Sequence, residues 1–171
     1  IDVNSPSNPV EILTAAQPSA AIPSKAAPVG DIAYIADEIQ GLRVFNVANP
    51  AAPYLVGMFD TPGTAHDVAV SGSTAYLADV DGGLRLLDIS VPSAPSDQGS
   101  VGAADARAVA VDGNYAYVAN GADGLRSISF SSIPPLIEDF VMNDHNEYIK
   151  NVAVSSNYAY LADEQFGLVI V

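Results

Sequence analysis

The sequence predicts an all-β fold made of tandem repeats, and three observations support this prediction. The dipeptide Ala-Tyr recurs at steps of 42, 41 and 43 residues, beginning at Ala33, Ala75, Ala116 and Ala159. The dipeptide Gly-Leu recurs with the same three steps, beginning at Gly41, Gly83, Gly124 and Gly167. Short apolar runs bounded by Gly, Pro, Asn and Asp fill each repeat, and no stretch has a sustained helical period. Two markers with the same irregular spacing identify four true repeats.

Each repeat contains four strand-length segments. In the second repeat they span residues 68–70, 74–78, 84–90 and, more weakly, 96–101. Leu84 and Leu86 would lie on one face of the third strand, and Leu87 and Ile89 on the other, so this strand is expected to be buried on both faces. Four-stranded sheets covered on both sides are typical of propeller blades. The sequence therefore predicts a four-bladed β-propeller.

The first strand of each repeat carries alanine at one shared position, at Ala27, Ala69, Ala110 and Ala153. Small side chains fit where the innermost strands converge on an axis. We expect the first strands to be innermost and the most buried. The repeated tyrosines, Tyr34, Tyr76, Tyr117 and Tyr160, are expected to lie between adjacent blades with largely buried rings.

The chain is interpreted as one propeller domain over residues 1–171. Residues 1–24 form a closing strand and linker, and the repeats span about 25–65, 66–106, 107–148 and 149–171. Fourth strands are expected at residues 10–15, 54–59, 96–101 and 136–141, so the first of them precedes any complete repeat. Both Val171 and Ile1 align with Leu87, inside a third strand.

We expect the N-terminal strand to complete the last blade. It would pair either within its own chain, which closes a ring, or with a neighbouring chain, which links subunits through an unpaired strand edge. The residues expected at this interface are Val10, Ile12, Leu13, Val169, Ile170 and Val171.

The motifs resemble those of the LVIVD-repeat family. The segment Gly167 to Val171 reads Gly-Leu-Val-Ile-Val, and segments starting at Gly41 and Gly83 are similar; a Tyr-x-Ala-Asp/Asn element recurs at each repeated tyrosine. The resemblance implies a β-propeller of the kind found in bacterial and archaeal surface or secreted proteins. It implies no shared catalytic residues.

Composition limits the partners. The chain has six Lys and Arg residues and twenty Asp and Glu residues, which gives a net charge of −14. This charge disfavours nucleic acid and anionic lipid as ligands. No apolar run reaches the ~18 residues of a membrane span. No signal peptide is visible in residues 1–9. The absence of cysteine excludes disulfides, thiol catalysis and cysteine metal sites.

Basic residues gather at two repeat positions. Lys25, His66, Arg107 and Lys150 lie at or near the start of the first strands, where a closed ring would place them at one mouth of the axial channel. They are the candidates for a small-anion or carboxylate site. The alternative is that each cation pairs with a neighbour such as Asp67 or Asp105. The second set, Arg43, Arg85 and Arg126, follows Gly-Leu and is expected to form hairpin pairs with Asp37 or Asp79.

Candidate metal ligands are few. Asp79 and Asp81 lie in a turn whose oxygens suit Ca²⁺, although Asp at such turns ordinarily bonds its own backbone. Asp144, His145 and Glu147 have a non-specific spacing typical of a solvated loop. No nucleophile, phosphate-binding or zinc motif is present.

We therefore expect a non-catalytic structural or interaction module that binds itself or other surface proteins, requires no cofactor and is secreted or at the cell surface. A ligand-binding propeller is the alternative, and an enzyme is not expected.

Overall fold

The computed structural model describes residues 21–102, 105–131, 136–138 and 148–171. Within these ranges the chain forms fifteen β-strands and no helix, arranged as four antiparallel sheets. The described residues accordingly offer no helix that could cross a membrane. The all-β fold predicted from the repeats is confirmed.

Each sheet is formed by consecutive strands of one repeat. The first sheet contains β1 (Pro23–Val29), β2 (Ile32–Asp37), β3 (Gly41–Asn46) and β4 (Tyr54–Phe59). The second contains β5 (Asp67–Ser71), β6 (Thr74–Ala78), β7 (Leu84–Asp88) and β8 (Ser96–Val101). The third contains β9 (Ala108–Asp112), β10 (Tyr115–Ala119), β11 (Leu125–Ser129) and β12 (Leu136–Glu138). The fourth contains β13 (Ile149–Ser155), β14 (Tyr158–Asp163) and β15 (Gly167–Ile170).

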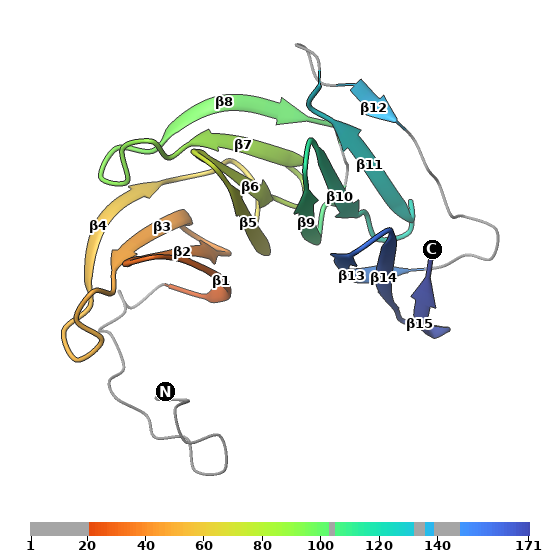
Figure 1. Ribbon diagram of the computed structural model, residues 1–171, viewed down its shortest axis with the longest axis horizontal. Coiled ribbons are helices and arrows are strands. Elements are labelled where there is room, and N and C mark those ends of the chain that lie inside the picture. Colours follow the sequence, from red (N-terminus) through yellow and green to blue (C-terminus); the bar gives the residue numbers. More distant parts are fainter. Residues whose placement is uncertain (1–20, 103–104, 132–135, 139–147) are drawn as a thin grey trace.

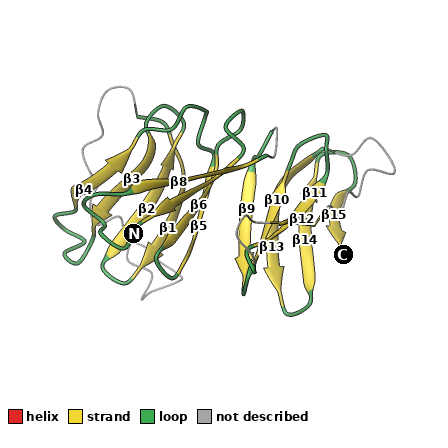
Figure 2. Cartoon of the chain, turned by 90° about the horizontal axis from the view of Figure 1, so that it is seen from above, coloured by secondary structure: helices red, strands yellow, loops and turns green. Residues whose placement is uncertain are grey.

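The four sheets follow one another along an arc, with the first strand of each sheet on the concave side (Figure 1). β1 contacts β5, β5 contacts β9 and β9 contacts β13, so the first strands are innermost as expected. The first and fourth sheets stand at opposite ends of the arc (Figures 1 and 2). This is a propeller-like repeat arrangement in which the described sheets do not close a ring.

The expectation that the first strands are the most buried is wrong. β1 is almost wholly exposed, whereas most residues of β2 and β3 are buried or half-buried. The reason is geometric: the concave side of an open arc faces solvent, while the central strands are covered by the sheets on either side.

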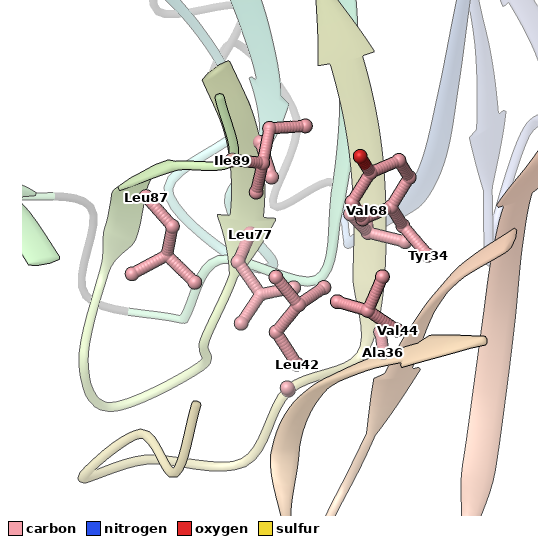
Figure 3. Close-up of a cluster of buried hydrophobic side chains, with 10 residues drawn as sticks. Tyr34, Ala36, Leu42, Val44, Val68, Leu77, Leu87 and Ile89 are labelled. Atoms are coloured by element: carbon pink, nitrogen blue, oxygen red, sulfur yellow. The ribbon is translucent and has the colours of Figure 1, made fainter. Parts of the chain in front are cut away.

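Each pair of adjacent sheets shares one hydrophobic cluster. Tyr34, Leu42 and Val44 of the first sheet pack against residues of the second sheet that include Leu77 and Leu87 (Figure 3). Similar clusters join the second sheet to the third and the third to the fourth. The prediction that a third strand is buried on both faces is confirmed in the second sheet, where Leu84 packs toward the third sheet and Leu87 toward the first.

Three of the four repeated tyrosines lie at these junctions as expected. Tyr34 is buried, and half-buried Tyr76 and Tyr117 pack against the next two clusters. The Tyr76 ring meets Phe130 edge-on, with centroids 5.2 Å apart. Burial raises the pKa of the Tyr34 and Tyr76 hydroxyls. Tyr160 is half-buried at the end of the arc.

Two of the predicted fourth strands, residues 54–59 and 96–101, match β4 and β8, and the strand predicted at 136–141 begins where β12 begins. The remainder of that strand and the predicted strand at 10–15 lie outside the described residues. In the described part of the chain, β15 is therefore the last strand of a three-stranded sheet and has a partner only on its β14 side.

The backbone conformation explains why each Gly-Leu pair has a glycine at its first position. Its φ angle is +70° at Gly41, +76° at Gly83, +79° at Gly124 and +78° at Gly167. This left-handed region is open to glycine and strained for residues with a Cβ. The repeated Gly-Leu therefore marks the tight turn that starts each third strand.

Candidate functional site

Two sheet faces at the ends of the arc form the candidate site. We call the face of a sheet that points to the next sheet in chain order its forward face, and the opposite face its rear face. The forward faces of the first three sheets and the rear faces of the last three are packed in the shared clusters. This leaves the forward face of the fourth sheet and the rear face of the first outside the shared clusters, although Arg43 and Phe45 on that rear face are only 2% and 5% exposed.

The leucine of Gly-Leu shows the contrast on the forward faces. Its exposed fraction is 0% at Leu42, 0% at Leu84 and 2% at Leu125, but 68% at Leu168. The backbone turn is the same in all four sheets, so the difference arises from the neighbour. A following sheet covers the first three leucines, and no described residue does so for the fourth.

The rest of the fourth sheet's forward face is also apolar. Register places Leu168 opposite Ala162 and Ile170 opposite Tyr160, and directly opposed residues in a sheet share a face. Ile170 is 54% exposed, and Ala162 is exposed as well. Val169 and Val171 alternate to the rear face, where they pack against the third sheet.

The rear face of the first sheet carries a second apolar group. Ala33 pairs with Phe45, which in turn pairs with Leu55, while Met58 lies opposite Arg43 and on the same face. Leu55 and Met58 are exposed, and Phe45 is buried beneath the Arg43 guanidinium, which stands 4.8 Å from its ring centroid. Contiguous exposed apolar groups mark interaction surfaces.

The interface residues expected from the sequence are placed in part. Val169 and Val171 are half-buried and Ile170 is exposed, all at the end of the fourth sheet. The backbone of Val171 exchanges hydrogen bonds with that of Ala159, at 3.0 and 2.8 Å. Val10, Ile12 and Leu13 lie outside the described residues.

Three of the four basic residues proposed for an anion site lie near a carboxylate. Lys25 Nζ is 4.0 Å from Asp67, Arg107 Nε is 2.8 Å from Asp105, and Lys150 Nζ is 3.1 Å from Glu164. The half-buried His66 donates its backbone N–H to the carbonyl of Ala78. These pairs agree with the ion-pair alternative, and the anion site stays a prediction.

The arginines after Gly-Leu form the hairpin pairs expected of them in two sheets. Arg43 is 3.4 Å from Asp37, and Arg85 is 3.9 Å from Asp79 and 2.7 Å from Asp97. Arg126 instead donates to the carbonyl of Gly102 at 3.0 Å and lies 3.9 Å from Asp123.

Asp79 has a structural role that sequence reasoning did not identify. Its buried carboxylate accepts hydrogen bonds from the Thr61 hydroxyl at 2.8 Å and the Gly63 N–H at 3.1 Å, in the segment leading into β5. Burial raises the pKa of this carboxyl, against the opposing effect of those two bonds and of Arg85. Asp37 and Asp163 similarly accept from the N–H groups of Ile22 and Tyr148, just before β1 and β13.

We call Asp37, Asp79 and Asp163 the hairpin aspartates, because each ends or directly follows a second strand and ties the start of its own sheet to the turn. The recurring Tyr-x-Ala-Asp element was the signal that could have revealed them. Asp81, the other calcium candidate, is exposed. Among described residues, no three His, Asp or Glu side chains group together in a way that would hold a metal ion.

Asp67 connects neighbouring sheets directly. One carboxylate oxygen accepts from the N–H of Val68 at 2.8 Å, and the other accepts from the N–H of Val109 in the third sheet at 3.1 Å. Burial raises the pKa of Asp67, although both bonds and the charge of Lys25 act in the opposite direction.

A cavity of about 450 Å³ lies between the third and fourth sheets. Tyr117, Leu125 and Ser127 line it from one side, and Val154 and Val171 from the other. In the two earlier junctions, Ile89 and Phe130 pack at the corresponding place, two residues beyond the position of Val171 in the repeat.

The fold and these faces define the chain as a propeller-like repeat protein whose sheets pack face to face in sequence. The LVIVD repeat matches it four times, over residues 27–61, 62–102, 103–128 and 148–171. These matches cover most of the chain, which belongs to the LVIVD-repeat family.

Solved structures support the fold. The computationally designed Ika4 protein is 11% identical with a TM-score of 0.69, over 96% of this chain and 98% of that one. The computationally designed Ika8 protein is 10% identical with a TM-score of 0.66, over 86% of this chain and 45% of that one. At these identities the likeness concerns the fold alone. A search of curated proteins found no match.

Proposed function

We propose that this chain is a non-catalytic structural or interaction module, acting at the cell surface or after secretion as a subunit of a larger assembly. The observation that carries the proposal is the end of the fourth sheet, where the edge strand β15 is followed by no described partner and its forward face exposes Leu168 and Ile170. An open strand edge is a template for another strand, and an exposed apolar face favours a protein partner.

In this proposal the N-terminal segment supplies the missing strand. The sequence of residues 1–14 resembles that of residues 87–100. The latter contain the end of a third strand, then a connection with two prolines, then the start of a fourth strand. Paired with β15 of its own chain, the segment closes a monomeric four-bladed ring; paired with a neighbour, it links subunits. An acidic, lysine-poor composition and the membership of this family support a role outside the cell.

Deletion of residues 1–14 tests the proposal. If the segment acts within its own chain, the shortened protein should lose stability or aggregate through the bare edge of β15. If it acts between chains, the shortened protein should remain soluble as single subunits, and a peptide of residues 1–14 should bind it. Thermal melting, light scattering and peptide titration separate these outcomes. A deletion that changes neither stability nor size, with no peptide binding, would refute strand pairing by this segment.

A further inference from the structure

The cavity between the third and fourth sheets is lined by residues that have counterparts at the two earlier junctions. Each hydrophobic cluster combines a tyrosine from the second strand of one sheet with a valine, an alanine and an apolar residue near the end of the third strand of the next sheet. At the last junction all four line the cavity, and they are Tyr117, Val154, Ala159 and Val171. The two earlier clusters include one more residue, Ile89 or Phe130, which has no counterpart among the described residues of the third cluster.

The backbone shows how this extra residue is held. The N–H of Ile89 donates to the carbonyl of Ser73, and the N–H of Phe130 donates to the carbonyl of Asn114, both at 2.8 Å. Each of these carbonyls belongs to the residue just before a second strand. Asn157 has that place in the fourth sheet, and it lines the cavity.

The side chain of the extra residue fills the space between two sheets. Ile89 is 4% exposed, and the Phe130 ring meets the Tyr76 ring edge-on with centroids 5.2 Å apart. Tyr117 is the repeat counterpart of Tyr76. The cavity therefore brings together the ring and the backbone position that hold the extra residue at the second junction.

Val3 has the sequence context of this extra residue. Residues 1–3 align with residues 87–89, and both Val3 and Ile89 stand three positions before the first proline of a Pro-x-x-Pro pair. Val47 has the same spacing, and its N–H makes the same bond, at 2.8 Å, to the carbonyl of the residue before β2. An apolar residue with this spacing is thus one that anchors to the turn before a second strand.

We propose that Val3 fills this cavity from within the same chain, donating its N–H to the carbonyl of Asn157 and packing on the Tyr117 ring. The inference rests on the proposed function, in which residues 1–14 supply the strand that pairs with β15. It adds to that function the anchor that fixes the register of the strand.

The length of the chain permits an occupant from the same molecule. The N–H of Ile22 donates to Asp37, which ties the chain to the first sheet at that point. Residues 4–21 lie between this tie and Val3, and an extended chain of that length reaches about 60 Å. A compact domain of this size has a radius of gyration of about 15 Å, so the reach is sufficient. A tethered segment also has an effective concentration in the millimolar range, which favours it over the same segment of a second copy.

The cavity is larger than a valine side chain requires. Its volume is about 450 Å³, and the equivalent place holds isoleucine at the first junction and phenylalanine at the second. Val3→Ile should therefore be accommodated and should strengthen the contact, because it buries one more methylene. Val3→Asp should weaken the contact, because it brings a charge into an apolar junction.

Photo-crosslinking in the full chain tests the location. With p-benzoylphenylalanine in place of Val3, light should join this position to residues that line the cavity, in a product with the 17.6 kDa mass of one chain. The same group in place of Asn4 is the matched control, because its repeat counterpart Ser90 is exposed, and it should give no crosslink there. Mass spectrometry of proteolytic fragments identifies the joined residues. A crosslink from position 3 to residues outside the cavity overturns the inference, and a product of two chains overturns its source in the same chain.

Thermal melting of the full chain tests the contribution of Val3. Val3→Asp should lower the melting temperature by about 3–10 °C, the shift expected when a buried aliphatic side chain is lost from a domain of this length. Asn4→Asp adds the same charge and should stay within about 1 °C. Val3→Ile should raise the melting temperature by about 1–3 °C. A Val3→Asp chain that melts with Asn4→Asp overturns the inference.

Ile12→Asp separates this inference from the proposed function, since it alters the strand and leaves the anchor unchanged. If Ile12→Asp lowers the melting temperature and Val3→Asp does not, strand pairing stands and cavity docking is overturned. If position 3 crosslinks to the cavity and Ile12→Asp has no effect, cavity docking stands and strand pairing fails. If deletion of residues 1–14 changes neither stability nor size, both are overturned.

Discussion

The forward faces of the second and fourth sheets differ in their surroundings more than in their sequences. Leu84 is fully buried in the cluster shared with the third sheet, while Leu168 is 68% exposed at the end of the arc. Both leucines follow a glycine with a left-handed φ angle and begin a third strand. In this fold, the next sheet determines whether a repeated side chain belongs to the core or to the surface.

The largest expected effect compares these two leucines. Leu84→Ala should lower the free energy of unfolding by about 2–5 kcal/mol, because it leaves a cavity in a packed junction. Leu168→Ala should cost less than about 1 kcal/mol in protein dilute enough to be monomeric. Urea denaturation of both variants measures the difference. An equally large loss at Leu168 in the monomer would mean that part of the same chain covers the fourth sheet.

Glycine substitutions sharpen the comparison at the neighbouring position. Gly167→Ala should lower the free energy of unfolding by about 1–2 kcal/mol, which is the backbone strain of a left-handed residue with a Cβ. No steric term is added, because that Cβ would meet no atom within 4 Å. Gly41→Ala should cost about 1–3 kcal/mol more, because its Cβ would lie 2.6 Å from the Thr61 nitrogen and also against the Phe59 carbonyl. Equal losses in thermal or urea unfolding would contradict the close approach at Gly41.

Removal of a hairpin aspartate should have a smaller effect. Asp79→Ala leaves the Thr61 hydroxyl and the Gly63 N–H without their acceptor and should cost about 1–3 kcal/mol. Asp81→Ala, two residues away and exposed, should stay within about 0.5 kcal/mol. Asp79→Asn should be milder than Asp79→Ala, because Asn120 occupies this repeat position in the third sheet. Unfolding curves for the three variants provide the test.

The smallest expected effect is on the dependence of stability on pH. Burial raises the pKa of Asp67 and Asp79 in the folded chain, so the folded state holds these protons more tightly than the unfolded state. Their contribution to stability is therefore greatest below the unfolded pKa and is lost as pH rises through the folded pKa. The melting temperature should rise as pH falls from 7 toward the ordinary pKa of an aspartate, about 4, and the rise should be smaller in Asp79→Asn. A melting temperature that falls over this range would contradict the prediction.

The repeat spacing allowed the strands to be predicted well. The proline-bounded fourth strands at 54–59 and 96–101 have the predicted limits, and the repeated glycines before the third strands all have a left-handed φ angle. These features depend on local backbone preferences, which a sequence carries directly. The pairing of Arg43 with Asp37 was also predictable, because both residues belong to one hairpin.

The environment of each sheet could not be predicted in the same way. The first strands were expected to be the most buried, yet β1 is exposed, because burial at the concave side depends on whether the arc closes. The Asp79 contacts with Thr61 and Gly63 were missed since they join residues that are 18 and 16 positions apart in the sequence. Such contacts depend on how a sheet begins, which periodicity alone does not reveal.

The face-to-face arrangement also has a consequence for how the molecule unfolds. Each sheet is held by its own hairpins and by contacts with its immediate neighbours, so the total stability approximates a sum of sheet terms and nearest-neighbour terms. An interior sheet has two such neighbours and a terminal sheet has one, so opening should begin at the ends and progress inward. A partner that covers a terminal sheet would supply its second neighbour and convert fraying at the ends into a single cooperative transition.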